Sequence, residues 1–266
     1  MKFLVAMILM LTLAAMQVPA QVGPAAGDAI FAPIPTVTGP APHLPDGTPD
    51  LSGAWMGGGA NSGDISKALK TGDSVKMLPW AQEVYDHRMA KDDPEAACLP
   101  FGIPRSAPYP WRLVQTKTHY FILYEGNIHS FRQIFMDGRK HPAADDLDPT
   151  WYGHSIGHWE GETLVVDTVG FNDKFWFDAL GHPHTEKLHT VERFTRADLG
   201  TLRMEVTIDD AGAYEKPFTT TGRARLMPNG ELMEYICNEN EQSAGHYVGP
   251  ARLPTEGITE PLRKPD

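Results

Sequence analysis

The chain has 266 residues, of which 41% are hydrophobic and 21% are charged, and this composition is typical of a globular protein with one sizeable domain. Its formal net charge of −11 argues against a nucleic-acid partner, because phosphate binding requires a basic surface.

The N-terminus is typical of a secretory signal peptide. Lys2 supplies a positive charge, residues 3–15 form a short apolar run, and small residues at 18–20 provide a cleavage site. We therefore expect residues 1–20 to be removed and the mature protein to be periplasmic or secreted, with no membrane span after cleavage. Residues 21–50 are rich in Pro and Ala and predict an irregular lead-in.

The two cysteines of the chain are Cys98 and Cys237. In an oxidising compartment, an even pair of cysteines is most simply a disulfide, which here would close a loop of about 140 residues. The alternative is a pair of buried free thiols.

The remaining elements are one helix and a long series of short strands. The helix is predicted over residues 78–89, where a proline suits the first turn. The strands are predicted at 50–55, 111–115, 119–125, 128–136, 153–159, 163–169, 187–194, 201–208, 218–226 and 232–237.

About ten short strands joined mainly by turns predict an all-β fold. We expect an antiparallel meander, closed into a single β-barrel over residues 51–250, because closure removes exposed edges. A two-sheet sandwich is the alternative. The tail at 251–266 is predicted to be irregular.

Two stretches of the chain resemble known families. PDLSGAW, at residues 49–55, is similar to the start of lipocalin-like (calycin-type) barrels, in which a G-x-W near the first strand closes the barrel base. Residues 120–240, which include ILYEGNIH and LHTVERF, resemble a group of exported, mostly uncharacterised bacterial proteins. A further resemblance, to cofactor-free lyases of lignin-derived aromatic dimers, implies an aromatic substrate, although no single motif carries it.

Titratable side chains gather in a hairpin whose strands are predicted at 153–159 and 163–169. Alternation places His154 and His158 on one face of the first strand, while Asp167 lies on the second. The two imidazoles are about 13 Å apart along a strand, so they cannot bind one metal ion together. We predict no metal and no cofactor. An alternative metal cluster consists of His182, His184 and His189.

Acid–base chemistry requires titratable pairs in a dry pocket. We expect His154 to act as the base or acid, with a carboxylate to orient it, a tyrosine as donor and an arginine to clamp an anion. The candidate catalytic residues are His154, Arg132, Tyr124, Asp167, His189 and Glu192.

Aromatic side chains are dense around this hairpin. The segment at 171–177, FNDKFWF, is too apolar for an ordinary exposed loop and predicts either a lid over the barrel mouth or part of the core. The candidate substrate-binding residues are Trp111, His129, Trp151, His158, Phe175, Trp176 and Tyr235.

These patterns lead to one main hypothesis and two alternatives. The main hypothesis is an exported cofactor-independent lyase or isomerase that binds a small apolar or aromatic molecule inside the barrel. The alternatives are a non-catalytic carrier of a hydrophobic ligand and a His-rich metal-binding protein. A homo-oligomer is compatible with all three.

Overall fold

The computed structural model describes residues 34–59, 63–105, 109–126, 130–237 and 239. The chain divides into two units, Met1–Ile34 and Pro35–Asp266, so every described residue except Ile34 belongs to the second unit. The predicted signal peptide at 1–20 and the predicted tail at 251–266 lie outside the described residues.

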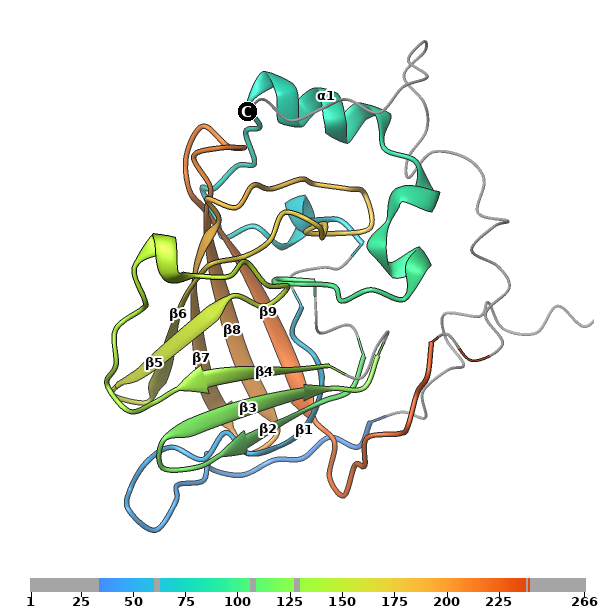
Figure 1. Cartoon of the computed structure of the whole chain (residues 1–266). Coiled ribbons are helices and arrows are strands. Elements are labelled where there is room, and N and C mark those ends of the chain that lie inside the picture. Colours follow the sequence, from blue (N-terminus) through green and yellow to red (C-terminus); the bar gives the residue numbers. More distant parts are fainter. Residues whose placement is uncertain (1–33, 60–62, 106–108, 127–129, 238, 240–266) are drawn as a thin grey trace, which may run out of the picture. The chain divides into compact units, whose positions relative to one another are not determined.

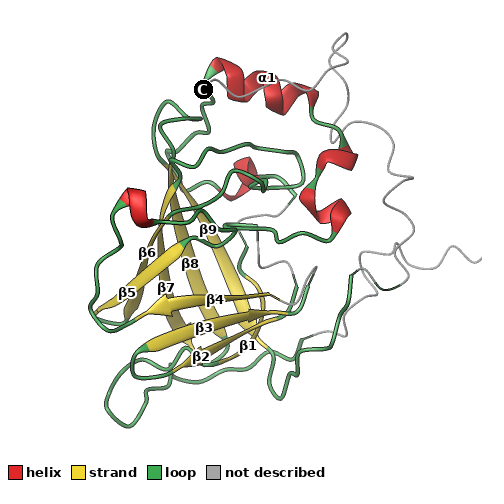
Figure 2. Cartoon of the chain, viewed as in Figure 1, coloured by secondary structure: helices red, strands yellow, loops and turns green. Residues whose placement is uncertain are grey.

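Nine strands of the described chain follow one another around a closed barrel (Figure 1). Figure 2 shows the same chain with helices, strands and loops in separate colours. The strands are β1 (Gly53–Gly57), β2 (Trp111–Gln115), β3 (His119–Tyr124), β4 (Ser130–Phe135), β5 (His154–Glu160), β6 (Thr163–Val169), β7 (His189–Asp198), β8 (Thr201–Asp209) and β9 (Phe218–Leu226). The predicted all-β barrel is therefore confirmed, and it is compatible with a lipocalin-like barrel.

Short helices lie outside the barrel wall. The α-helix α1 covers Pro79–His87, within the predicted range, and begins with a proline as expected. Four 3₁₀ turns complete the described helical segments: η1 (Ile65–Ala68), η2 (Ala90–Asp92), η3 (Pro94–Ala97) and η4 (Ala144–Asp146).

One joint of the barrel departs from the predicted antiparallel meander. The strands β4 and β5 pair in parallel, with Ile134 opposite Ser155 and Phe135 opposite Ile156. Strand directions cannot alternate all the way around a ring of nine, so an odd ring must contain at least one parallel pair. A parallel pair needs a long crossover, and here the connection at 136–153 supplies it.

The predicted strand at 232–237 does not form. The turn before it is present, because the Gly230 N–H donates to the Met227 carbonyl oxygen at 2.9 Å. However, β9 already pairs with β8 on one side and β1 on the other, so the closed barrel has no free edge for another strand. The segment is held instead by side chains, for example by Glu125, which accepts from the Met233 N–H at 2.8 Å.

The barrel lumen is packed with side chains. Inward-facing residues of the strands form one buried cluster that contains Trp55, Trp111 and Phe194. A partly open pocket among the lumen residues, lined by Trp111, Tyr124 and Glu192 among others, has a volume of only about 20 Å³, which is enough for about one water molecule. This pocket is much smaller than the central ligand cavity expected from the sequence.

A second buried cluster closes one end of the barrel. It contains Phe171, Phe175 and Phe177, all with no exposed surface. Figure 1 shows α1 beyond this end of the barrel, with loops between the helix and the strands. The Trp80 indole of α1 donates to the Gly212 carbonyl oxygen at 2.8 Å. The apolar segment at 171–177 is thus part of the core of this cap.

The predicted disulfide between Cys98 and Cys237 is present, with the two Cα atoms 5.7 Å apart. It joins the end of η3 to the segment that follows β9, across 139 residues of sequence. Disulfides persist in oxidising compartments, so this bond is consistent with an extracytoplasmic location.

Replacement of both cysteines by serine should lower the free energy of unfolding by about 5 kcal/mol, because the unfolded chain loses the constraint of a closed loop of about 140 residues. Denaturant unfolding of the wild-type and C98S/C237S proteins measures the difference. As a control, reductant should shift the midpoint of the wild-type protein and leave the double variant unchanged. Equal midpoints for the two oxidised proteins would contradict this prediction.

Candidate functional site

The barrel wall divides the candidate catalytic residues into two groups. Three of them point into the lumen and are buried: Arg132, Glu192 and Tyr124, which are 1%, 3% and 7% exposed. The other three lie on strand positions that face outward and are partly exposed: His154, Asp167 and His189. On β5, Ser155 points inward and is fully buried, so its neighbour His154 must point outward. The two groups therefore cannot act as one catalytic set within the lumen.

The inner group centres on a buried ion pair. The guanidinium Nη2 of Arg132 lies 2.5 Å from the carboxylate Oε2 of Glu192. Arg132 also donates from Nε to Ser155 Oγ at 3.0 Å and from Nη2 to Thr168 Oγ1 at 2.8 Å. Burial lowers the pKa of Arg132, but the charge of Glu192 and the hydrogen bonds that the guanidinium donates to Glu192 and Tyr124 outweigh this effect and hold the guanidinium pKa above its usual range.

This ion pair joins β4 to β7, which are not neighbours in the barrel. Arg132 is thus committed to four groups of the protein, one of which is the residue next to His154. The arrangement is typical of a buried pair that fixes the wall, because each charge would be strongly destabilising without the other.

The outer group forms a chain of hydrogen bonds with one additional residue, His141. The His154 Nδ1 and His141 Nδ1 atoms are 2.8 Å apart. His141 Nε2 lies 2.8 Å from Asp167 Oδ1, and His189 Nε2 lies 3.0 Å from Asp167 Oδ2. The carboxylate of Asp167 therefore holds two imidazoles, and one of these contacts the third.

When the three imidazoles are neutral, the carboxylate of Asp167 determines which ring nitrogen of each histidine carries the proton. An ionised carboxylate only accepts, so the Nε2 atoms of His141 and His189 both carry protons that point to Asp167. The Nδ1 atom of neutral His141 is then an acceptor, and His154 must donate to it from Nδ1. This leaves Nε2 of His154 unprotonated, with a lone pair that is available to act as a base.

The electrostatic surroundings also favour a neutral His154 and an ionised Asp167. Burial lowers the pKa of His154, and the charges of His141 and Arg139 lower it further. Burial alone would raise the pKa of Asp167, but hydrogen bonds and charge from His189 and His141 outweigh it and lower this carboxyl pKa. The hydrogen-bonded series thus combines a carboxylate whose pKa is lowered with a terminal imidazole that burial and neighbouring charges make harder to protonate than a free histidine.

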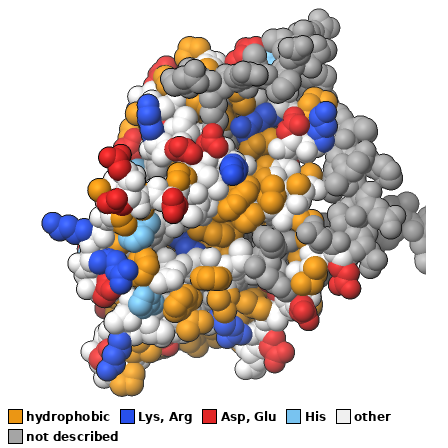
Figure 3. All heavy atoms as spheres, viewed as in Figure 1, with side chains coloured by type: hydrophobic (Ala, Val, Ile, Leu, Met, Phe, Trp, Pro, Cys, Tyr) orange, Lys and Arg blue, Asp and Glu red, His pale blue; other side chains and the backbone are white. Residues whose placement is uncertain are grey.

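His154 lies at the edge of a groove of about 650 Å³ along the β4–β5 joint. The aromatic residues of the groove are Phe131, Phe135, Trp151 and Tyr152. The ring of His154 stacks on Phe135, with the ring centroids 5.0 Å apart. On the face that carries β4 and β5, histidine side chains lie next to hydrophobic ones (Figure 3). The groove therefore offers apolar walls and one basic nitrogen.

Tyr152 links this groove to the inner cluster. Its ring stacks on Tyr124 with the centroids 5.3 Å apart, and its hydroxyl lies 2.8 Å from Ser130 Oγ. Burial raises the pKa of Tyr152, and the neighbouring Tyr124 raises it further, so the phenol stays protonated. Tyr152 lines the groove and can therefore donate a hydrogen bond there.

The candidate substrate-binding residues are scattered. Trp151 lines the groove. Trp111 lies in the lumen, where its indole donates to the Gly57 carbonyl oxygen at 2.8 Å. Phe175 and Trp176 are buried in the cap. The remaining three are elsewhere: His158 and Tyr235 are exposed, and His129 lies outside the described residues.

The alternative metal cluster is not assembled. The His182 ring bonds to Asp178 at 2.6 Å, and His184 stacks on Phe175 with the centroids 3.9 Å apart, both within the cap. His189 belongs to the outer chain instead. In the described part of the molecule, no three His, Cys, Asp or Glu side chains converge on a point where they could hold a metal ion.

No pattern in the sequence marks His141 as a site residue. This residue belongs to the connection between β4 and β5, where no periodicity marks it. Only the position of this connection over β5 and β6 brings the ring to Asp167. Its side chain is 18% exposed, so the connection shields the middle of the hydrogen-bonded chain.

The chain matches no protein-family model, no curated protein and no solved structure in the comparisons made. Among the described residues, no helix is long and apolar enough to cross a membrane.

The Glu192→Gln substitution should lower the free energy of unfolding by about 3–5 kcal/mol, because Arg132 would keep its charge in a buried site without a counter-ion. Glu160→Gln is the matched control. Glu160 pairs with Arg193 at 2.7 Å on the exposed face, so its replacement should cost no more than about 1 kcal/mol. Denaturant unfolding compares the two, and equal losses would contradict a structural role for the buried pair.

Stability should fall on mild acidification because the pKa of His154 is lowered in the folded state. Below about pH 6.5 the unfolded chain takes up this proton first, so the free energy of unfolding decreases as the pH falls toward the folded pKa of His154. His154→Gln should remove this part of the slope, while His43→Gln, at an exposed histidine, should keep it. Thermal unfolding between about pH 5 and pH 8 tests this, with Asp167 ionised throughout.

Proposed function

We propose that the groove along the β4–β5 joint binds a small aromatic molecule and that His154 transfers a proton to or from it. The observation that carries this proposal is the hydrogen-bonded chain from Asp167 through His141 to His154, which ends at the groove. A carboxylate that orients one imidazole, which in turn orients a second, supports a neutral base with a defined free nitrogen.

The chemistry is acid–base catalysis that uses only side chains of the protein. His154 Nε2 would accept a proton from the bound molecule, and the positive charge that forms would be shared with His141 and stabilised by the Asp167 carboxylate. Return of the proton to another atom of the same molecule is an isomerisation, and its transfer to a leaving group is an elimination. A lyase or an isomerase step is therefore the reaction class that these groups support.

The walls of the groove favour an aromatic ligand. Phe131 is 60% exposed, and Phe135, Trp151 and Tyr152 provide further ring faces and edges for stacking. The resemblance to cofactor-free lyases of lignin-derived aromatic dimers makes such dimers the first substrates to test. The signal-like N-terminus and the disulfide support action outside the cytoplasm.

Arg132 has a positioning role in this proposal. It holds Ser155, the residue that precedes Ile156 and follows His154 in β5, and so fixes the strand that carries the base. Because Arg132 is only 1% exposed and bonds to Glu192, Ser155 and Thr168 inside the wall, we do not assign it contact with the substrate.

His154→Gln should lower turnover of a dimer substrate by at least about 100-fold, because it removes the base. Affinity, measured by quenching of tryptophan fluorescence, should change far less. The panel to screen is a set of lignin-type aromatic dimers, with products identified by mass spectrometry. His43→Gln is the matched control and should retain wild-type turnover, because His43 lies against Glu162 outside the groove.

Two outcomes separate enzyme from carrier. Turnover that survives His154→Gln unchanged would rule out the assigned base. Binding that is weakened by Trp151→Ala, without any product from any ligand, would instead show a carrier that uses the same groove.

A further inference from the structure

Two arginines face each other on the outer surface of the barrel, away from the groove described above. Arg203 of β8 is the register partner of Arg223 of β9, and both side chains are exposed. Arg225 follows on the same face of β9, opposite Thr201. Directly opposed residues have Cβ atoms about 5 Å apart, and like charges at such positions are destabilising. This arrangement therefore costs stability unless something else occupies it.

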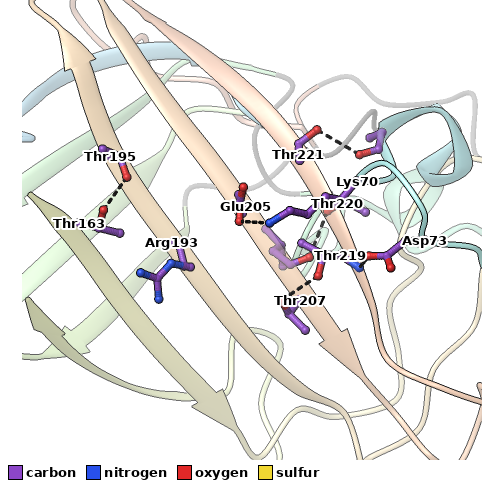
Figure 4. Close-up of polar contacts among 12 residues, drawn as sticks. Lys70, Asp73, Thr163, Arg193, Thr195, Glu205, Thr207, Thr219, Thr220 and Thr221 are labelled. Atoms are coloured by element: carbon purple, nitrogen blue, oxygen red, sulfur yellow. Dashed lines mark hydrogen bonds and ion pairs between the residues drawn. The ribbon is translucent and has the colours of Figure 1, made fainter. Parts of the chain in front are cut away.

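The nearby carboxylates do not neutralise these arginines. Glu205, two residues along β8, bonds to Lys70 at 3.0 Å, and the two side chains meet in Figure 4. Glu160 bonds to Arg193 at 2.7 Å on the neighbouring part of the wall. Among the described residues, the guanidinium groups of Arg203, Arg223 and Arg225 have no hydrogen bond or ion pair, although the whole chain carries a net charge of −11.

The opposed arginines line a groove of about 550 Å³. Its polar lining is completed by Thr221 and Glu205. The Glu205 carboxylate would oppose an anion, but Lys70 offsets its charge. With Arg225 beside them, the cations of this surface outnumber its one carboxylate, so the local charge is positive.

We propose that this β8–β9 groove binds a tetrahedral oxyanion, a phosphate or sulfate group, between Arg203 and Arg223. Guanidinium forks match the oxygens of such groups and can bind them in a bidentate manner. Two guanidinium groups carried on directly opposed residues suit one dianion better than one carboxylate, and the bound anion replaces their repulsion with two attractions. The group can be free or can belong to a lipid headgroup.

The site is independent of the proposed catalytic groove. The strands β8 and β9 are separated from β4 and β5 by β6 and β7 on one side and by β1 to β3 on the other. Loss of either activity would therefore leave the other in place.

The test compares the full-length protein with the R203Q/R223Q and R193Q variants in inorganic phosphate, at constant ionic strength set with chloride. Phosphate at ten times its dissociation constant should raise the wild-type Tm by about 3 °C. The shift should vanish in R203Q/R223Q. It should persist in R193Q, whose arginine lies on the same face but is already paired.

A second measurement shows that the double variant is folded. In low salt without phosphate, its Tm should equal or exceed that of the wild type, because the like-charge contact is removed. No phosphate effect on the wild type at matched ionic strength, or an equal effect in R203Q/R223Q, would overturn the proposal.

Sedimentation with vesicles of phosphatidylcholine and phosphatidic acid identifies the source of the group. Binding that requires both arginines supports a lipid headgroup. A phosphate-dependent Tm shift without vesicle binding supports a free or small-molecule phosphate.

Discussion

Closure of a nine-stranded ring is the constraint on which the rest of the structure depends. An odd ring must contain a parallel joint, and here that joint is β4–β5, with two registered residue pairs against seven between β5 and β6. A parallel joint needs a crossover, and the crossover carries His141 over the barrel wall to Asp167. The groove and the hydrogen-bonded histidine chain are both consequences of the way in which this barrel closes.

The weakly paired joint is reinforced from inside. Arg132 of β4 bonds to Ser155 of β5 and Thr168 of β6 and forms an ion pair with Glu192 of β7. These side-chain contacts span four successive strands at the place where backbone pairing is shortest. The buried ion pair therefore compensates for the short backbone pairing between β4 and β5. Because this reinforcement lies inside the barrel, the groove on the outer surface of the joint stays open.

Much of the fold follows from the sequence because strand signals are local. Alternation along β8 is unambiguous, since Leu202, Met204, Val206 and Ile208 are apolar while the residues between them are polar, and all four are buried. The segment at 232–237 follows a strong turn signal and is rich in apolar residues, but it forms no strand, because strand pairing also requires a free edge. Whether an edge is free depends on closure of the whole barrel, so it cannot be predicted from the residues of one segment.

The site was harder to predict than the fold because β5 has no clear inner face. One set of alternate positions holds His154, Ile156 and His158, and the other holds Ser155, Gly157 and Trp159. Both sets mix polar and apolar residues, so alternation cannot decide which set is buried. The deciding contact is Arg132 with Ser155, which comes from another strand. The contact of His141 with Asp167 was harder still to predict, because the two residues are 26 positions apart and the connection that carries His141 has no regular pattern.

A packed lumen also changes how charge is used in this barrel. The interior can hold Arg132 only because Glu192 neutralises it, so titratable groups that must change charge are excluded from the interior. On the outer wall, water and neighbouring side chains can respond to a change in charge, and the three imidazoles and Asp167 lie there. Among the described residues, the barrel thus keeps its buried ion pair inside and its hydrogen-bonded histidines on the outer wall, beside the groove.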